Sequence, residues 1–173
     1  DAVATTVIIG RGATAQATVH LAPDAWRDLS EEGLRVILTH ECVHVALVPA
    51  TSSATPAIPL WLLEGVAEYV AYAASSVPTD EVLTPLWQQV AREGPPQDFP
   101  DDADFTAGHS DILLAYAKAH TAARSYVQRH SEEELVDLVL DTEADRAARV
   151  AELLPQWQAD LREDAARVGA AQE

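Results

Sequence analysis

Two histidines and a glutamate stand at the spacing of a helical metal site. His40, Glu41 and His44 form the pattern H-E-x-x-H. Residues four apart lie on one face of a helix, about 6 Å from each other, so the two imidazoles can converge on one ion. Zinc accepts imidazole nitrogens at about 2.0–2.1 Å. Glu41 would lie beside the ion, where it can hold and deprotonate a metal-bound water. The alternative is a buried helix with two hydrogen-bonded histidines.

A second segment, from Trp61 to Tyr69, supplies two further carboxylates. Glu64 follows His44 after 19 intervening residues, on a helix of its own. Catalytic zinc takes three protein ligands and keeps a fourth position open, so Glu64 is the candidate third ligand. Glu68 lies one turn further along and can accept a hydrogen bond from the non-ligating nitrogen of a ligand histidine. A solvated helix face is the alternative for Glu68.

These two segments together resemble a known family. H-E-x-x-H, followed after about 19 residues by Trp-Leu-x-Glu-Gly-x-Ala-x-Tyr, resembles the gluzincin zinc metallopeptidases. The resemblance covers roughly residues 30–135 and is strongest to compact bacterial peptidase MA-like domains and aminopeptidase N-like catalytic domains. It implies that His40, His44 and Glu64 bind Zn²⁺ and that Glu41 is the general base.

A third segment, Leu114 to His120, resembles the tyrosine-containing helix of the aminopeptidase N-like enzymes. The resemblance implies that Tyr116 donates its hydroxyl to the oxyanion that develops during hydrolysis. A core aromatic residue is the alternative. His120, one helical turn away, is the rival transition-state donor, and a structural role is its alternative. The Gly-x-Met-Glu-Asn motif of these aminopeptidases is missing, since the chain has no Met.

The expected function is therefore zinc-dependent hydrolysis of peptide bonds, as an endopeptidase rather than an aminopeptidase. A water activated by the metal attacks the carbonyl, Glu41 takes its proton and returns it to the leaving amine. Two alternatives stay open. One is a catalytically silent zinc-binding domain with an interaction or regulatory role, and the other is a metal-dependent hydrolase with a different substrate.

Composition limits the partners. Lys and Arg number 11 against 28 Asp and Glu, a net charge of −17, which argues against nucleic acid and anionic membrane surfaces. No apolar run reaches the ~18 residues of a membrane span. The partner that the family resemblance implies is a peptide or protein substrate. The only cysteine, Cys42, is expected to be a small packed residue turned away from the ligands. The chain starts at Asp1 and has no Met, so we expect a fragment of a longer bacterial precursor that is secreted or membrane-anchored.

The elements that must position these residues form an α+β fold. Residues 1–173 are expected to make a single zincin-like domain: a small, mostly antiparallel N-terminal sheet on the active-site helix, then a mainly helical half. The cleft lies between them, and the second strand is the candidate edge for an extended substrate. The predicted strands are Ala2–Ile9 and Ala15–Leu21. The predicted helices start at Ser30 and end at Pro49, run from Leu60 to Ser75, from Thr84 to Arg92, from Ser110 to His130 and from Ser131 onward, with a break at Pro155.

Overall fold

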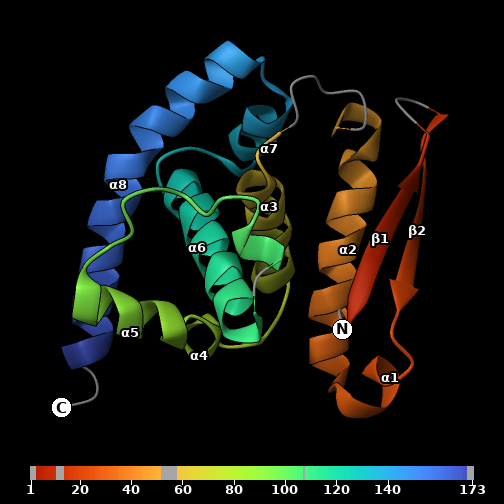
Figure 1. Ribbon diagram of the computed structural model, residues 1–173, viewed down its shortest axis with the longest axis horizontal. Helices are drawn as coiled ribbons and strands as arrows, with labels where there is room; N and C mark the ends of the chain where they lie inside the picture. The colour runs from red at the N-terminus through yellow and green to blue at the C-terminus, as the bar shows by residue number, and fades with distance from the viewer. Residues whose placement is uncertain (1–2, 11–13, 52–57, 107, 171–173) are drawn as a thin grey trace.

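The hairpin and the helices follow the predicted order. The computed structural model describes residues 3–10, 14–51, 58–106 and 108–170. The elements are β1 (Ala4–Ile9), β2 (Gln16–Leu21), α1 (Ala25–Asp28), α2 (Glu31–Thr51), α3 (Leu60–Ala73), α4 (Thr79–Val82), α5 (Thr84–Glu93), a 3-10 turn (Asp104–Thr106), α6 (His109–Val127), α7 (Glu132–Leu140) and α8 (Glu143–Ala170) (Figure 1). This arrangement confirms the predicted α+β class.

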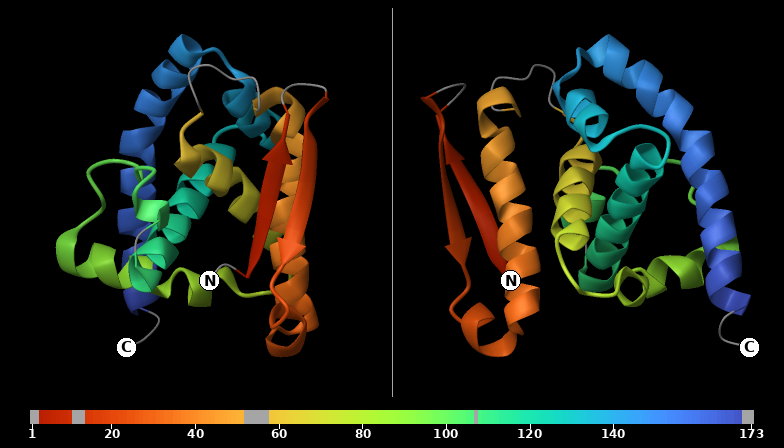
Figure 2. Two further views of the ribbon diagram at one scale, coloured as in Figure 1. Left: turned by 45° about the vertical axis from the view of Figure 1, so that its right-hand side comes forward. Right: turned by 180° about the vertical axis from the view of Figure 1, so that it is seen from behind.

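The N-terminal strands form one antiparallel pair. Ala4 lies opposite Leu21 and Ile9 lies opposite Gln16. Gly10 ends β1 with a φ of 94°, a left-handed conformation that glycine adopts without strain. Both views in Figure 2 place β1 nearer than β2 to the helical half. A two-stranded sheet is marginal by itself, so its packing on α2 helps to hold it.

The helix α2 carries the H-E-x-x-H motif and starts as predicted. The hydroxyl of Ser30 accepts a hydrogen bond from the backbone N–H of Gly33 at 3.0 Å. The predicted end at Pro49 is wrong, because α2 continues to Thr51. A proline near a helix end removes only one backbone hydrogen bond, and the turn before it is anchored by Leu47 and Val48, which are buried. Residues 52–57, which lie between the two predicted helices, are outside the described residues.

The centre of the helical half is the contact between α3 and α6. One face of α3 is buried along its length, including Leu62, Val66 and Ala67. Gly65 permits the close approach, because a Cβ there would lie 2.6 Å from the backbone oxygen of Ala119 on α6. The position of Glu64 is therefore fixed by backbone packing.

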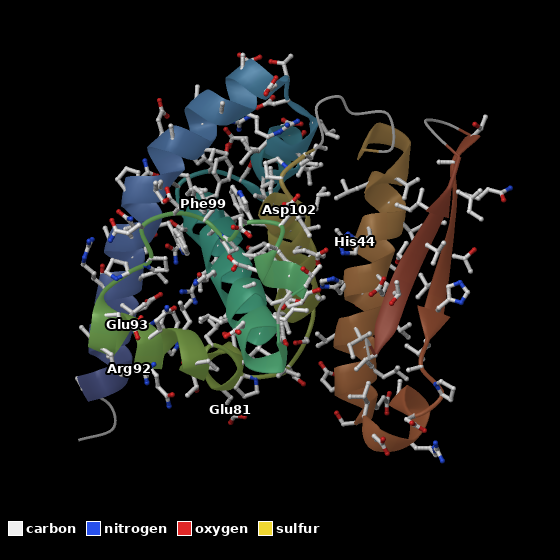
Figure 3. The ribbon with its side chains drawn as sticks, viewed as in Figure 1. His44, Glu81, Arg92, Glu93, Phe99 and Asp102 are labelled. Carbon is white, nitrogen blue, oxygen red and sulfur yellow. The ribbon has the colours of Figure 1, made fainter. Side chains whose placement is uncertain are left out.

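The long segment between α5 and α6 is anchored by aromatic stacking. Phe99 lies between two tryptophans, with ring centroids 4.1 Å from Trp61 and 5.0 Å from Trp157 (Figure 3). Asp102 accepts a hydrogen bond from the backbone N–H of Leu60 at 3.2 Å. This segment therefore holds the start of α3 in place.

The C-terminal helices confirm one prediction and correct another. The capping box at Ser131 is present at the start of α7. The predicted break at Pro155 is wrong, because α8 runs through it from Glu143 to Ala170. A proline inside a helix costs about 3 kcal/mol. Trp157 offsets this cost, because its ring is fully buried and its Nε1 donates to the hydroxyl of Thr121 at 3.0 Å.

Three smaller boundaries differ from the prediction. Leu83, and not Thr84, is the N-cap of α5, although a proline does occupy its first turn. The short helix α4, directly before it, was not predicted. The N-cap of α6 is Gly108, so this helix starts one residue before Ser110 and ends at Val127.

Candidate metal centre

Three side chains from two helices converge on one point. His40 and His44 lie one turn apart on α2, and their Nε2 atoms are 3.0 Å from each other. Glu64 approaches from α3, with Oε2 at 3.1 Å from Nε2 of His40 and 3.4 Å from Nε2 of His44. Figure 3 shows His44 on the side of α2 that faces α3. Within the described part of the chain, this is the one cluster of three such residues with the geometry of a metal site.

These distances fit a zinc ion. Three ligands at about 2.0–2.1 Å from a tetrahedral ion lie about 3.3 Å from one another. Oε2 of Glu64 is buried and accepts no well-directed hydrogen bond, although two imidazole nitrogens lie beside it. A buried oxygen without a donor is costly, and a cation at the shared point would satisfy it. The donor set of two imidazoles and one carboxylate is one that catalytic zinc uses.

The side chains of the centre are strongly coupled. Burial favours neutral His40, but the carboxylates of Glu64 and Glu68 outweigh it and raise the pKa of His40 above its usual range. Burial likewise favours protonated Glu64, but His40 and His44 outweigh it and lower the pKa of this carboxyl. A cation bound at Nε2 of His40 would therefore have to displace a proton from this nitrogen.

Glu68 lies where the sequence predicts a supporting residue. Its Oε1 is 2.9 Å from Nδ1 of His40, the nitrogen on the far side of the ring from Glu64. The distance is that of a hydrogen bond, although the ring N–H does not point directly at the oxygen. Such a contact holds the ring so that Nε2 faces Glu64 and His44, as the ring of a metal-binding histidine would be held.

Glu41 is buried beside the ligands. It is only 7% exposed, and its Oε2 accepts a hydrogen bond from the hydroxyl of Thr6 on β1. This contact crosses from the hairpin to α2 and fixes the direction of the carboxylate. The sequence analysis missed Thr6, and the only signal for it is a polar residue on the inward side of a β-branched strand.

A cavity of about 360 Å³ opens beside the centre. Residues of β1 and α2 line it together with residues of α3, the 3-10 turn and α6, so it lies between the N-terminal half and the helical half, where the cleft is predicted. The strand that borders it is β1, through Ala4, Thr6 and Ile8, and no residue of β2 lines it. The expected role of Ala15–Leu21 as the substrate edge is therefore wrong, because β2 lies on the far side of β1. The side chains that line the cavity are Ala4, Thr5, Thr6, Ile8, His40, Glu41, His44, Leu47, Leu63, Glu64, Phe105, Ile112 and Tyr116.

Tyr116 lies on the wall of this cavity. Its ring centroid is 6.1 Å from that of His40 and 5.3 Å from that of Phe105, which holds it edge-on. Burial, and then the negative charges of Glu64, Glu68 and Glu41, raise the pKa of the phenol. The hydroxyl therefore keeps its proton at neutral pH and can donate it in a hydrogen bond. Phe105, which the sequence analysis did not single out, is the residue that orients this ring.

Two other predicted residues lie elsewhere. His120 does not line the cavity at the centre but a neighbouring one, where it packs edge-on against Tyr72 at 5.6 Å between centroids. The expectation that it rivals Tyr116 is not supported by this position. Cys42 is turned away from the ligands as expected, but it is exposed, so its description as a packed residue is wrong. It lies beside Leu38 on the outer face of α2.

Comparisons with known proteins give no relative for this chain: no family model, no curated protein and no solved structure matches it. Among the described helices, none combines the length and the apolar character that a membrane crossing requires.

Proposed function

We propose that this chain is a zinc-dependent peptidase of the gluzincin type that cleaves internal peptide bonds. The observation that carries the proposal is the convergence of His40, His44 and Glu64 within 3.4 Å of one another, at the edge of a cavity. Zinc at this point would lower the pKa of a water molecule toward 7 and polarise a carbonyl group.

Glu41 is the general base in this proposal. Its carboxylate lines the same cavity as the three ligands and carries no positively charged partner among the described residues. Thr6 occupies one of its oxygens, so the other is available to a water molecule. Glu41 accepts a proton from this water as it attacks the carbonyl carbon, and it then passes the proton to the leaving nitrogen.

Tyr116 is the proposed hydrogen-bond donor to the oxygen of the carbonyl group that is attacked. Its protonated phenol can donate a hydrogen bond to the negative charge that forms on this oxygen during the attack. The unpaired edge of β1 borders the cavity and offers backbone groups to an extended peptide. The missing Gly-x-Met-Glu-Asn motif favours cleavage within a chain over removal of an N-terminal residue.

Digestion of casein and of a mixed peptide library tests the proposal. We expect cleavage by the zinc-loaded protein, loss of cleavage with a chelator and recovery when zinc is restored. A stoichiometric zinc complex that cleaves neither substrate would instead support the catalytically silent interaction domain. Cleavage that persists without metal would contradict the proposed chemistry.

A further inference from the structure

A second cavity, which the proposed chemistry does not use, adjoins the metal centre. It has a volume of about 370 Å³, within the usual range of small-ligand pockets. Tyr116 lines both cavities, and Glu68 connects them because it lines this one and contacts His40. A substrate with its scissile carbonyl at the centre could therefore place a neighbouring side chain here.

The walls of this second cavity are suited to a long aliphatic stem. Val82 and Leu113 are 37% and 48% exposed at its rim, where Pro85 is exposed too, and the buried Leu83 and Ala117 line it further in. An apolar ligand group that covers these exposed side chains removes apolar surface from water, which favours binding.

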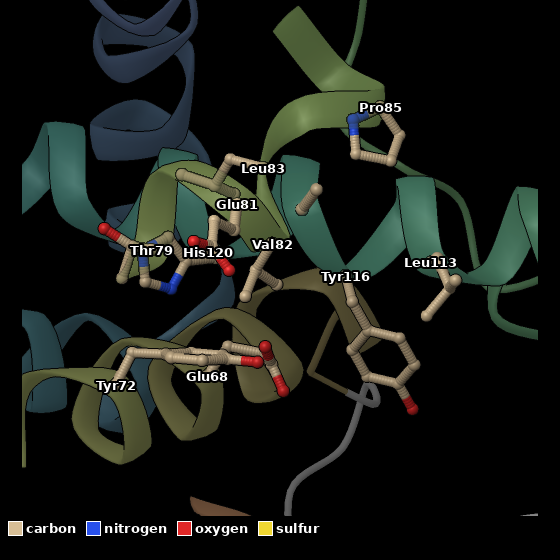
Figure 4. Close-up of a pocket in the computed structure, with 11 residues that line it drawn as sticks. Glu68, Tyr72, Thr79, Glu81, Val82, Leu83, Pro85, Leu113, Tyr116 and His120 are labelled. Atoms are coloured by element: carbon tan, nitrogen blue, oxygen red, sulfur yellow. The ribbon is translucent and has the colours of Figure 1, made fainter. Parts of the chain in front are cut away.

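Its polar side chains are two carboxylates, three hydroxyls and one imidazole, and the carboxylates are its only charged acidic groups among the described residues. Figure 4 shows Glu68 from α3 and Glu81 from α4 on opposite sides of the cavity, with Tyr72 and Tyr116 flanking Glu68. No Lys or Arg lines this cavity among the described residues. Two carboxylates and two aromatic rings around an apolar space are the surroundings that a cationic group prefers.

His120, which also lines this cavity, has a buried ring nitrogen without a hydrogen-bond partner, and a ligand with an N–H group could supply one. The residue is 4% exposed, and its Nδ1 is the nitrogen without a partner. Burial, and then the charge of Arg124, lower the pKa of His120 to about 4, so the ring is neutral. A neutral imidazole has one nitrogen lone pair that can accept a hydrogen bond. Arg124 itself is paired with Asp164.

We infer that this cavity is a specificity pocket for a Lys or Arg side chain adjacent to the scissile bond. The inference rests on the proposed peptidase function. The stem lies along Val82, Leu83 and Leu113, and the cationic head lies between Glu68 and Glu81. The charge of −17 on the chain also draws cationic peptides toward it.

Paired substrates test the inference. Two blocked peptides differ only in one residue next to the cleaved bond, lysine in one and norleucine in the other, which has a similar stem but no charge. We expect kcat/KM of the zinc-loaded protein to be about tenfold higher for the lysine peptide, as for one charge-assisted hydrogen bond. Glu81→Gln should reduce this ratio about fivefold or more. Glu163→Gln, the same change on the exposed face of α8, should leave the ratio as it is.

A binding measurement separates this inference from the proposed function. Nα-acetyl-lysinamide, whose side-chain ammonium group is free, should shift the methyl NMR signals of Val82 and Leu113 at a lower concentration than Nα-acetyl-norleucinamide does. If no peptide is cleaved but this difference is found, the peptidase proposal fails and the cationic pocket holds. Equal kcat/KM for the paired peptides, an unchanged ratio in Glu81→Gln, or equal binding of the two amides would overturn the pocket. If peptides with a free N-terminal amine were preferred equally whether they carried lysine or norleucine, the pocket would recognise chain ends, and this result would also overturn the inference.

Discussion

At the scale of single residues, the orientation of Glu41 depends on one hydroxyl. Thr6 donates to its carboxylate from the neighbouring strand, while the other oxygen is left for the reaction. Residues that orient an active group in this way are typically worth about 10–100-fold in activity. We therefore expect Thr6 to position Glu41 in its proposed role as the base, and removal of the hydroxyl should lower the rate of cleavage.

Replacement of Thr6 by Val tests this role. The two side chains have nearly the same shape, so the strand should keep its structure and the ligands should keep zinc. We expect kcat to fall about tenfold, with KM little changed. Thr18→Val on the exposed side of β2 is the matched control and should retain wild-type kcat. A wild-type rate in the Thr6 variant would show that the hydroxyl does not orient the base.

Tyr116→Phe tests the proposed donor to the carbonyl oxygen. The interaction forms mainly in the transition state, so kcat and kcat/KM should fall together while KM stays nearly constant. Loss of such a donor typically lowers kcat by ~10²–10³-fold. The phenyl ring keeps its contact with Phe105, so zinc content and stability should not change. Steady-state kinetics on His120→Ala provide the comparison, and a larger loss of kcat there would reassign the donor.

At the scale of the elements, the sequence predicts the motif-bearing helices well and their ends less well. Ser30 and Ser131 start helices as expected, because side-chain caps are local interactions. Pro49 and Pro155 fail as stop signals, because each lies next to residues that the tertiary core buries. The approach of His40 to His44 was predictable from helical spacing, and Glu64 was predicted as their partner from its place on the following helix. Thr6 and Phe105 were not, because their contacts join segments far apart in the chain.

The close packing of α3 on α6 at Gly65 is expected to support both stability and zinc binding. Gly65→Ala would bring a Cβ to 2.6 Å from the oxygen of Ala119, so the two backbones must separate. We expect a loss of about 1–3 kcal/mol in the free energy of unfolding, and weaker zinc binding because Glu64 moves with α3. Denaturant unfolding and a zinc competition titration measure the two effects.

Gly169→Ala is the control for helix propensity. No atom lies within 4 Å of a Cβ at this position on α8, so the substitution should be neutral or stabilise by up to about 1 kcal/mol. If Gly65→Ala behaved like Gly169→Ala, the close approach of α3 and α6 would not be needed to place Glu64.

At the scale of the whole molecule, the metal would join two parts of the fold. His40 and His44 come from α2, which carries the hairpin, and Glu64 comes from α3 in the helical half. Zinc should therefore stabilise the folded chain as a unit. At a free zinc concentration 1,000 times Kd, binding contributes about 4 kcal/mol. We expect this to raise Tm by roughly 8–16 °C for a chain of this size.

Thermal unfolding with and without a chelator checks this effect. The chelator should lower Tm of the wild-type protein to the value of the metal-free chain. His44→Ala lacks one ligand, so its Tm should respond little to zinc. An equal zinc response in the wild type and in His44→Ala would place the metal elsewhere.

Glu41 is proposed to use this zinc centre to hydrolyse peptide bonds, and one comparison separates this chemistry from zinc binding alone. Wild type and Glu41→Gln are brought to the same zinc content, verified by elemental analysis, and kcat/KM is measured on the same peptide. Gln keeps the size of the side chain but accepts a proton poorly, so we expect equal zinc and a rate lower by ~10²–10⁴-fold. Equal rates in the two zinc-loaded proteins would show that Glu41 is not the general base.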